Sequence, residues 1–202
     1  KENNLDVIAV LIGKFDENTE KICKDYGANK IIEADVEQYN IKSYGEIVVK
    51  LVKEYSPKLF LAGTTPVAKD VTAYASSKLD MVSLSNVSDI KMQDDFEFTI
   101  ALYGGAVLRD ASINSDTTKF ALLSSGAFKK VLSPVDNVEI IKEDCSEQIK
   151  DLLTIIKESV TEISESVNLE EAEIIVACGR GMGTPEGYKL VEDLAKQLGG
   201  AI

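Results

Sequence analysis

Short apolar runs alternate with amphipathic segments through the first 78 residues, and this alternation restricts the fold more than any other feature of the chain. Three apolar runs have the length of strands, and each is followed by a segment with helical periodicity. The expected strands are 5–12, 30–33 and 58–62, and the expected helices are 16–26, 41–55 and 66–78. Parallel strands joined by helices need right-handed crossovers. The sequence therefore predicts an α/β fold with a mostly parallel, doubly wound, Rossmann-like sheet.

Local signals mark the ends of these elements. The run 5–12 is apolar throughout, which predicts a strand covered on both faces. Asp16 is a suitable N-cap, and Gly27 stands just past the end of the same helix, where a left-handed residue is favoured. Pro66 lies near the first position of the third helix, which tolerates its missing N–H. In the helix 41–55, one face carries four apolar residues: Ile47, Val48, Leu51 and Val52.

From residue 81 onward the pattern changes to strands without intervening helices. Glycines at 104, 105 and 126 provide turns between them. The expected strands are 85–90, 97–102, 119–124 and 138–142. We expect these strands to extend or edge the parallel sheet.

An acidic, serine-rich stretch at 145–170 predicts a junction between two domains. Residues 1–144 are expected to form an α/β nucleotide-binding-like domain. Residues 171–202 combine an apolar run, a glycine-rich turn and a helical segment, which predicts the first strand-loop-helix unit of a second, truncated α/β domain. Within the junction, 146–153 can begin a short helix, whereas 154–163 suits either a helix or a strand.

The charge and hydropathy of the chain exclude several classes of partner. Thirty-four acidic residues against 22 basic ones give a net charge of −12, which disfavours binding to nucleic acid and to anionic membrane surfaces. No apolar run approaches the roughly 20 residues of a membrane span. The first residues do not resemble a signal peptide, so we expect a cytoplasmic protein.

The absence of histidine excludes Ser-His-Asp and Cys-His catalysis and every histidine-metal site within these residues. Cys23, Cys145 and Cys178 form no Cys-x-x-Cys pair, so neither a zinc site nor a disulfide framework is indicated. No pair of carboxylates, lysines or tyrosines has a spacing that suggests acid-base catalysis. We therefore expect no self-contained hydrolase, no catalytic residues and no metal site.

The glycine-rich turn at 179–183, with the sequence Gly-Arg-Gly-Met-Gly, is the strongest candidate for a binding site. It lies between the apolar run 174–177 and the helical segment 188–198, where α/β proteins receive phosphate groups or cofactors. Glycines permit close backbone approach and positive φ, free amides at the helix start favour an anion, and the arginine adds a bidentate donor. The spacing does not match Gly-x-Gly-x-x-Gly, so a tight turn with an exposed arginine stays open.

Two further turns follow expected strands. The first, 63–66, offers hydroxyl groups to a phosphate together with Lys69, but a helix N-cap with proline at the first helical position explains it more simply. The second, 103–105, has paired glycines, which are usually part of an ordinary turn.

The order of these segments resembles the α subunit of electron-transfer flavoproteins over nearly the whole chain. The matching segments are Ala62-Gly63-Thr64-Thr65 with Asp70, Tyr103-Gly104-Gly105, Ser125-Gly126-Ala127-Phe128, Leu169-Glu170-Glu171-Ala172, Gly179-Arg180-Gly181-Met182 and 189–195. They occur in the order and spacing of the family, which is more specific than the glycine-rich turn alone.

The resemblance implies an electron carrier that uses FAD, not a stand-alone enzyme. In that family a second α/β domain holds FAD, and its opening Gly-Arg-Gly turn contacts the flavin cofactor. Arg180, Gly179, Gly181 and Met182 would then be the local cofactor-binding residues, and the family loops that supply most of the remaining FAD contacts would lie beyond residue 202.

The same resemblance implies partners. The family works as a heterodimer with the electron-transfer flavoprotein β subunit. The complex accepts electrons from an acyl-CoA dehydrogenase or a similar redox enzyme and passes them to another redox partner. The family also places a strand and a helix ahead of the segment that begins here, so both are expected to be missing from these residues.

Five residues at three places depart from the family pattern. Cys178 stands where the family has the first of two glycines before the arginine. Ile100-Ala101 takes the place of an Arg-Pro pair, and Ala68-Lys69 takes the place of Gly-Arg. The departures predict a divergent branch of the family and leave the role of Arg180 unaffected.

Two other interpretations stay open. One is an α/β domain of the stress-protein type, which would bind ATP or AMP in the crevice of the first domain. The other is a cofactor-free fragment whose role is heterodimer assembly. Flavin in the purified protein would separate both from the electron-carrier interpretation.

Overall fold

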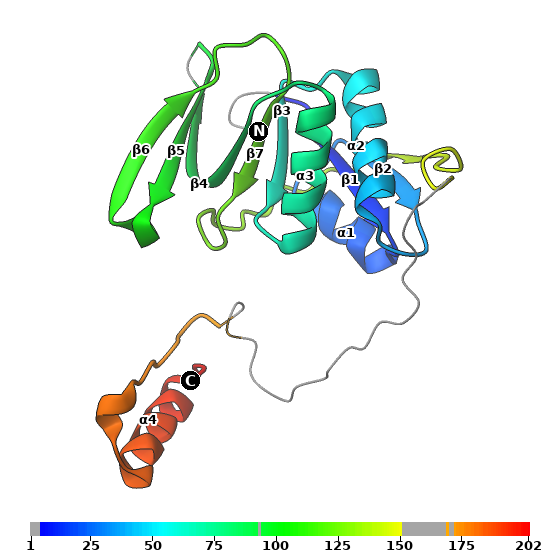
Figure 1. The fold of residues 1–202 in the computed structure, drawn as a ribbon. Coiled ribbons are helices and arrows are strands. Elements are labelled where there is room, and N and C mark those ends of the chain that lie inside the picture. Colours follow the sequence, from blue (N-terminus) through cyan, green and yellow to red (C-terminus); the bar gives the residue numbers. More distant parts are fainter. Residues whose placement is uncertain (1–4, 93, 151–168, 170–171) are drawn as a thin grey trace. The chain divides into compact units, whose positions relative to one another are not determined.

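The computed structural model describes residues 5–92, 94–150, 169 and 172–202 (Figure 1). The chain divides between residues 157 and 158 into two compact units, and each unit is described here by itself. Residues 146–150, where a short helix was expected to begin, form turns. The rest of that segment and the ambiguous segment 154–163 lie outside the described residues, as does most of the expected junction.

The first unit contains every strand and helix that the sequence predicts before residue 143. Its helices are α1 (Glu17–Asp25), α2 (Ile41–Tyr55) and α3 (Pro66–Lys78). Its strands are β1 (Ile8–Gly13), β2 (Lys30–Asp35), β3 (Leu59–Gly63), β4 (Ser83–Met92), β5 (Phe96–Leu102), β6 (Val107–Ser112), β7 (Lys119–Leu123) and β8 (Glu139–Lys142). The strand β6 was not predicted, because most of its side chains are exposed and its sequence shows no apolar periodicity.

The strands form one parallel sheet and one mixed sheet, which together give the α/β fold that was predicted. One sheet has the order β1-β2-β8 and is entirely parallel. The other has the order β3-β7-β4-β5-β6, in which β7 pairs in parallel with β3 and β4, whereas β5 pairs antiparallel with β4 and β6. Strands β4, β5, β6 and β7 therefore extend the sheet that contains β3, and β8 is an edge strand of the sheet that contains β1.

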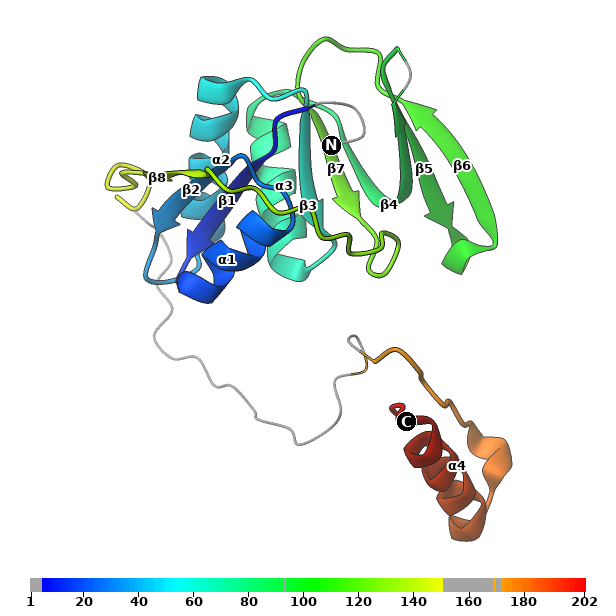
Figure 2. The same cartoon turned by 180° about the vertical axis from the view of Figure 1, so that it is seen from behind.

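Helices lie on both faces of the strands, which is the doubly wound arrangement. In Figure 1, α2 and α3 lie in front of the strands; in the reverse view of Figure 2, α1 lies in front instead. The predicted apolar face of α2 is buried at all four positions: Ile47, Val48, Leu51 and Val52. Phe120 of β7 is also fully buried and packs in the same cluster as Val48 and Val52.

The helix caps also agree with the sequence. Asp16 caps α1, where its Oδ1 accepts a hydrogen bond of 2.8 Å from the Thr19 N–H. Gly27 follows the end of α1 with φ of +103°. Thr65 caps α3 and accepts a hydrogen bond of 3.2 Å from the Ala68 N–H, while Pro66 occupies the first turn.

The strand β1 departs from its predicted environment. A continuously apolar run predicts cover on both faces, yet Val10 in its middle is 37% exposed, and Ile8 and Ile12 are only half-buried. The prediction of full burial is therefore wrong. The physical reason is that β1 pairs only with β2, and no sheet partner is described on its other edge.

The second unit is small and contains one regular helix, α4 (Pro185–Leu198), among its described residues. The apolar run 174–177 was expected to be a strand, but it forms only an isolated parallel bridge between Ile175 and Ala201. Ile174 and Ile175 are both exposed. A strand needs a neighbouring strand of comparable length for its hydrogen bonds. The described residues of this unit supply only the short turn that follows α4, so 174–177 does not form a strand.

None of the helices in the described ranges is long and apolar enough to cross a bilayer.

Candidate functional site

The glycine-rich turn is a single 3₁₀ turn at Arg180–Met182 that leads into α4. The Met182 N–H donates to the Gly179 carbonyl at 3.1 Å, and the Gly183 N–H donates to the Arg180 carbonyl at 3.2 Å. Gly183 has φ of +56°, a left-handed conformation that glycine adopts at little cost. The four residues proposed as cofactor ligands therefore lie together on one exposed turn.

Three consecutive N–H groups of the turn are available to a ligand. Within the described part of the chain, the N–H groups of Gly179, Arg180 and Gly181 donate no hydrogen bond to the protein. All three residues are exposed. Neighbouring backbone N–H groups that point to solvent form a favourable site for an anion.

Gly179 and Gly181 are not required by the folding of the turn itself. Neither has a positive φ, and a Cβ atom built on either would meet nothing within 4 Å. Glycine at such positions costs conformational entropy without relieving strain or crowding. Glycine at positions 179 and 181 does, however, allow a group from outside the described residues to approach the backbone closely.

Gly187, by contrast, is required by packing. A Cβ atom at this position would lie 2.6 Å from the carbonyl oxygen of Met182, because the turn folds back onto the first turn of α4. This role of Gly187 was not predicted from the sequence. The sequence feature that could have indicated this role is a glycine inside the first turn of a helix, where glycine is otherwise unfavourable.

Arg180 is exposed and makes no ion pair or side-chain hydrogen bond with any described residue. Its guanidinium is thus free to bind an anion in a bidentate manner. Met182 is also exposed and adds a flexible apolar side chain next to it. The turn therefore offers a cation, three N–H donors and an apolar contact.

The start of α4 is less open to an anion than the sequence suggested. Thr184 is the N-cap, and its Oγ1 accepts a hydrogen bond of 3.2 Å from the Gly187 N–H. Pro185 has no N–H, and Glu186 places a negative charge in the first turn. An anion at this site would be bound mainly by the glycine-rich turn.

The two other candidate turns have the simpler structural roles. The residues Gly63-Thr64-Thr65-Pro66 connect β3 to the N-cap of α3. The residues at 103–105 form the turn between β5 and β6, with positive φ at Tyr103, Gly104 and Gly105. Tyr103 is 86% exposed, so it contacts little of the described chain.

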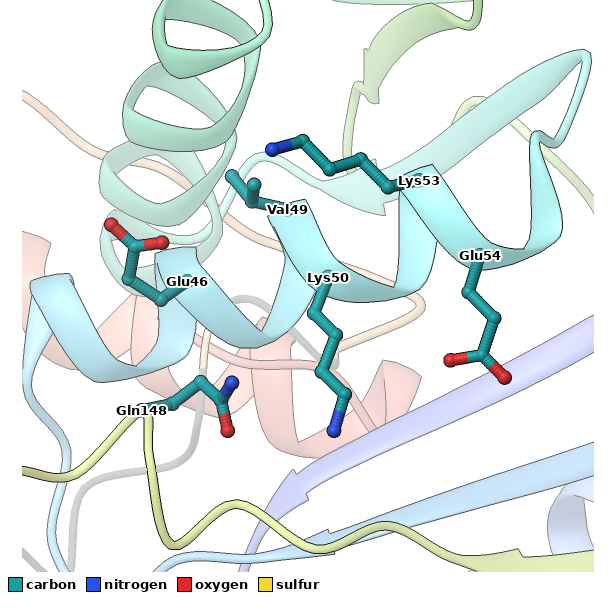
Figure 3. Close-up of a pocket in the computed structure, with 6 residues that line it drawn as sticks. All are labelled: Glu46, Val49, Lys50, Lys53, Glu54 and Gln148. Atoms are coloured by element: carbon teal, nitrogen blue, oxygen red, sulfur yellow. The ribbon is translucent and has the colours of Figure 1, made fainter.

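A hollow of about 440 Å³ lies beside α2, with charged side chains around it (Figure 3). Lys50 on its wall pairs with Glu143, and its Nζ also donates to the Asp144 carbonyl at 3.1 Å. The hydrogen bond that the Lys50 ammonium donates to the Glu143 carboxylate raises the pKa of Lys50. Of its two lysines, Lys50 is already paired within the protein, and the carboxylates of Glu46 and Glu54 also line the hollow, so it is a poor site for an added anion.

The cysteines do not combine into a redox or metal centre. Cys178 next to the turn is an exposed free thiol, Cys145 is buried, and Cys23 is half-buried. Burial raises the pKa of the Cys145 and Cys23 thiols. No group of three or more acidic, cysteine or histidine side chains in the described ranges is arranged to hold a metal ion.

Comparison with known families covers nearly the whole chain. Residues 1–151 match the electron transfer flavoprotein domain. Residues 168–202, which include the glycine-rich turn and α4, match the electron transfer flavoprotein FAD-binding domain. The two matches have the order that the sequence resemblance implies.

Individual relatives give the same result. The electron transfer flavoprotein subunit alpha of Thermoanaerobacterium thermosaccharolyticum is 28% identical over all of this chain and 63% of its own length. That of Bacillus subtilis is 30% identical over 98% of this chain and 61% of its own length. The acryloyl-CoA reductase electron transfer subunit beta of Anaerotignum propionicum is 24% identical over all of this chain and 64% of its own length.

The chain thus spans a little more than three fifths of the length of these relatives. The two domain matches account for 151 and 35 of its 202 residues. The chain belongs to the electron transfer flavoprotein family, with an electron transfer flavoprotein domain followed by the start of the FAD-binding domain of the alpha subunit.

Proposed function

We propose that this chain serves electron transfer as part of a flavoprotein alpha subunit, and that the turn at 179–182 contacts FAD in the intact protein. FAD, when bound, supplies the redox chemistry, while the protein positions it and sets its environment. The family match at 168–202 and the geometry of the turn support this assignment. Residues 1–144 would form the first domain, 145–170 the junction and 171–202 the start of the FAD-binding domain.

The residues of the turn fit a cofactor that carries phosphate groups. Arg180 supplies a positive charge with no partner among the described side chains, and three adjacent N–H groups supply donors. Arginine and clustered backbone N–H groups are common ligands of pyrophosphate. The observation that carries the proposal is the open space over Gly179 and Gly181, since the fold of the turn does not itself require glycine there.

The proposed partners are a flavoprotein beta subunit and a redox enzyme that donates electrons, such as an acyl-CoA dehydrogenase. One relative is named as an electron transfer subunit of acryloyl-CoA reductase, which fits a donor or acceptor that handles acyl-CoA. The net charge of −12 would steer docking toward a basic surface on a partner. Because the relatives described above are bacterial proteins, we place this one in the bacterial cytoplasm.

The test replaces Gly181 by valine in the intact complex with the beta subunit. The added side chain occupies the open space over the turn without a positive φ to strain it, so the fold should tolerate it. We expect the Kd for FAD to rise about tenfold or more, which corresponds to about 1.4 kcal/mol. Flavin absorbance relative to polypeptide, and a titration of the apoprotein with FAD, measure the effect.

Gly63→Val is the matched control, because Gly63 also has no positive φ, and a Cβ atom built on it would likewise meet nothing within 4 Å. It is the last residue of β3 in the first unit. Unchanged FAD affinity in Gly181→Val would refute the proposed contact. Loss of a bound adenine nucleotide in Gly63→Val alone would instead support the ATP- or AMP-binding alternative.

A further inference from the structure

Glu33 of β2 is a buried acidic residue in the first unit. Only 5% of its surface is exposed, and its Oε1 accepts no hydrogen bond from any described residue. A buried polar group without a partner costs free energy, and a buried charge costs more. The packing of an α/β fold does not call for an acidic residue at such a position, so Glu33 requires an explanation.

The side chain of Glu33 points to the face of the sheet that carries α1. Side chains on a strand alternate between the two faces of its sheet. The neighbours Ile32 and Ala34 pack in the same cluster as Ile47 and Leu51 of α2. Glu33 therefore points to the opposite face, where α1 lies over the strands (Figure 2).

The side of α1 that meets the sheet is polar. Glu20, Cys23 and Lys24 are half-buried, and their spacing places them on one face of the helix. Within this face the Lys24 ammonium lies 3.8 Å from a Glu20 carboxylate oxygen. No residue of α1 is buried. Apolar packing therefore contributes little to holding this helix on the sheet.

A pair of carboxyl groups connects α1 to the sheet. The side chains of Glu20 and Glu33 form a hydrogen bond with each other. Two ionised carboxylates are both acceptors, so one member of the pair must carry a proton. Burial and the negative charge of Glu20 raise the pKa of Glu33, and the ammonium groups of Lys142 and Lys24 offset this increase only in part.

The strands beside β2 do little to stabilise an ionised Glu33. Its register partners are Leu11 of β1 and Lys142 of β8. Leu11 carries no charge. Lys142 is exposed, and an exposed ammonium stabilises a carboxylate only weakly because water screens the interaction. The proton shared with Glu20 is therefore the main compensation for the burial of Glu33.

If both carboxyls ionise, the helix and not the strand is the part that can move. Glu33 is held in place because β2 pairs with a strand on each side, and its carbonyl also accepts from the Glu143 N–H at 2.7 Å. The helix α1 has no buried side chain to anchor it in the same way. Repulsion between Glu20 and Glu33 is therefore relieved by movement of α1.

The end of α1 is held separately from its start. The Ser133 N–H donates to the Asp25 carbonyl at 2.9 Å, and the Val135 N–H donates to the Lys24 carbonyl at 3.1 Å. These bonds do not involve the carboxyl pair. The start of α1, which carries Glu20, is therefore the part that the pair controls.

We propose that Glu20 and Glu33 form a pH-sensitive contact: with one shared proton it holds the start of α1 against β2, and loss of that proton to water releases the start of α1 from the sheet. Because folding raises the pKa of Glu33, the contact stabilises the docked helix fully below the ordinary value of 4.5. The stabilisation is lost as the pH rises through the higher pKa of the folded protein. The helix should therefore be docked more firmly at mildly acidic pH than at alkaline pH.

The test is amide hydrogen exchange, followed by mass spectrometry, in the intact subunit bound to the beta subunit. Peptides from 16–22 report on α1, and peptides from 44–55 report on α2 as an internal reference. Between about pH 5 and about pH 8, after correction for the intrinsic exchange rate, we expect the protection of the α1 peptides to fall at least about threefold. The protection of the α2 peptides should stay constant.

Three substitutions identify the groups responsible. Glu33→Gln removes the titration and keeps the contact, because the amide is neutral at every pH and its NH₂ group donates to the Glu20 carboxylate. In this variant the protection of α1 should be the same at both ends of the pH range. Glu20→Gln tests the pair from the other side and should also remove the pH dependence. Glu17→Gln is the matched control, because it removes an exposed carboxylate from the same helix and should keep the pH dependence of the parent complex.

The proposal fails on any of three results. The first is protection of α1 that does not change with pH in the parent complex. The second is a pH dependence that persists in Glu33→Gln or, if that variant does not assemble, in Glu20→Gln. The third is an equal loss of pH dependence in Glu17→Gln, which would assign the effect to the net charge of the helix and not to the carboxyl pair.

Discussion

At the scale of single residues, Arg180 carries the most specific prediction. In the intact complex, Arg180→Ala should weaken FAD retention, because the guanidinium has no partner among the described residues and its removal deletes a donor for the cofactor. We expect about a tenfold or larger loss of affinity. Equilibrium dialysis of FAD measures the affinity, and thermal unfolding checks that the fold is intact. Arg109→Ala, at the only other arginine of the chain and on exposed β6, is the control and should retain FAD.

An unchanged FAD affinity together with an unchanged flavin potential in Arg180→Ala would contradict the assignment. The residue scale is also where the sequence was most informative. A glycine-rich sequence between an apolar run and a helix located the turn, and the caps at Asp16 and Thr65 followed from side-chain chemistry. The packing role of Gly187 was not predictable, because it depends on the path by which the turn returns over α4.

At the scale of elements, the contact between α2 and α3 is held by a small residue. A Cβ atom on Gly45 of α2 would lie 2.2 Å from Cδ1 of Tyr74 on α3, so the two helices approach closely at this point. Gly45→Ala should destabilise the first unit by about 1–3 kcal/mol, because the ring cannot move away without disturbing the helix interface. Urea unfolding measures the change. An equal or higher stability, as helix propensity alone would give, would contradict this packing.

The same interface contains a pH-dependent link. The Tyr74 hydroxyl donates to Glu46 Oε1 at 2.6 Å, and the Lys78 ammonium lies 3.1 Å from the same oxygen. These interactions lower the pKa of Glu46 below its usual 4.5, and the carboxylate raises the pKa of Tyr74 to about 12. A carboxyl whose pKa is lowered on folding stabilises the fold above its unfolded pKa and loses this contribution as pH falls.

Glu46→Gln should therefore reduce the free energy of unfolding by about 1 kcal/mol at pH 7, and the difference from the parent chain should shrink as pH falls below about 4.5. Chemical unfolding at several pH values measures both effects. Glu54→Gln, at an exposed position of the same helix, is the control. A difference that stays constant from pH 7 down through the unfolded pKa would show that ionisation of Glu46 does not contribute.

Helices and strands were predicted correctly where the periodicity of their own sequence determines the structure. The prediction failed where the structure depends on which strands lie next to each other. The helix α2 was predicted with its buried face because four apolar residues recur at helical spacing. The exposure of β1 was not predicted, because it depends on whether another strand lies beside it. The strand β6 was missed because its pairing with β5, and not its own side chains, holds it in place.

At the scale of the whole chain, the first unit should fold without the second. Among the described residues, the three clusters of buried apolar side chains all consist of residues before 146, so the first unit has a core of its own. Residues 1–150 alone should unfold with the same urea midpoint as the corresponding transition in residues 1–202. Circular dichroism measures both. A clearly lower midpoint in the shorter chain would mean that the second unit stabilises the first.

The fold class was predictable at this scale because crossovers impose a parallel sheet on alternating strands and helices. The separation into two sheets was not, since the alternation of residues 5–78 predicts strands and not the order in which they pair. The membership of the family followed from several short segments in a fixed order, and the comparisons confirm it.

The bridge between Ile175 and Ala201 has a consequence for how the second unit would grow. A Cβ atom on Gly200 would lie 2.6 Å from the Ile174 carbonyl oxygen, so only glycine lets the chain turn back this closely after α4. Residues that continued this pairing would have the register set by that one parallel bridge. A shift of one residue in this register would move each side chain to the opposite face of the sheet. Gly200 thus fixes how Ile175 and Ala201 are aligned on either side of α4.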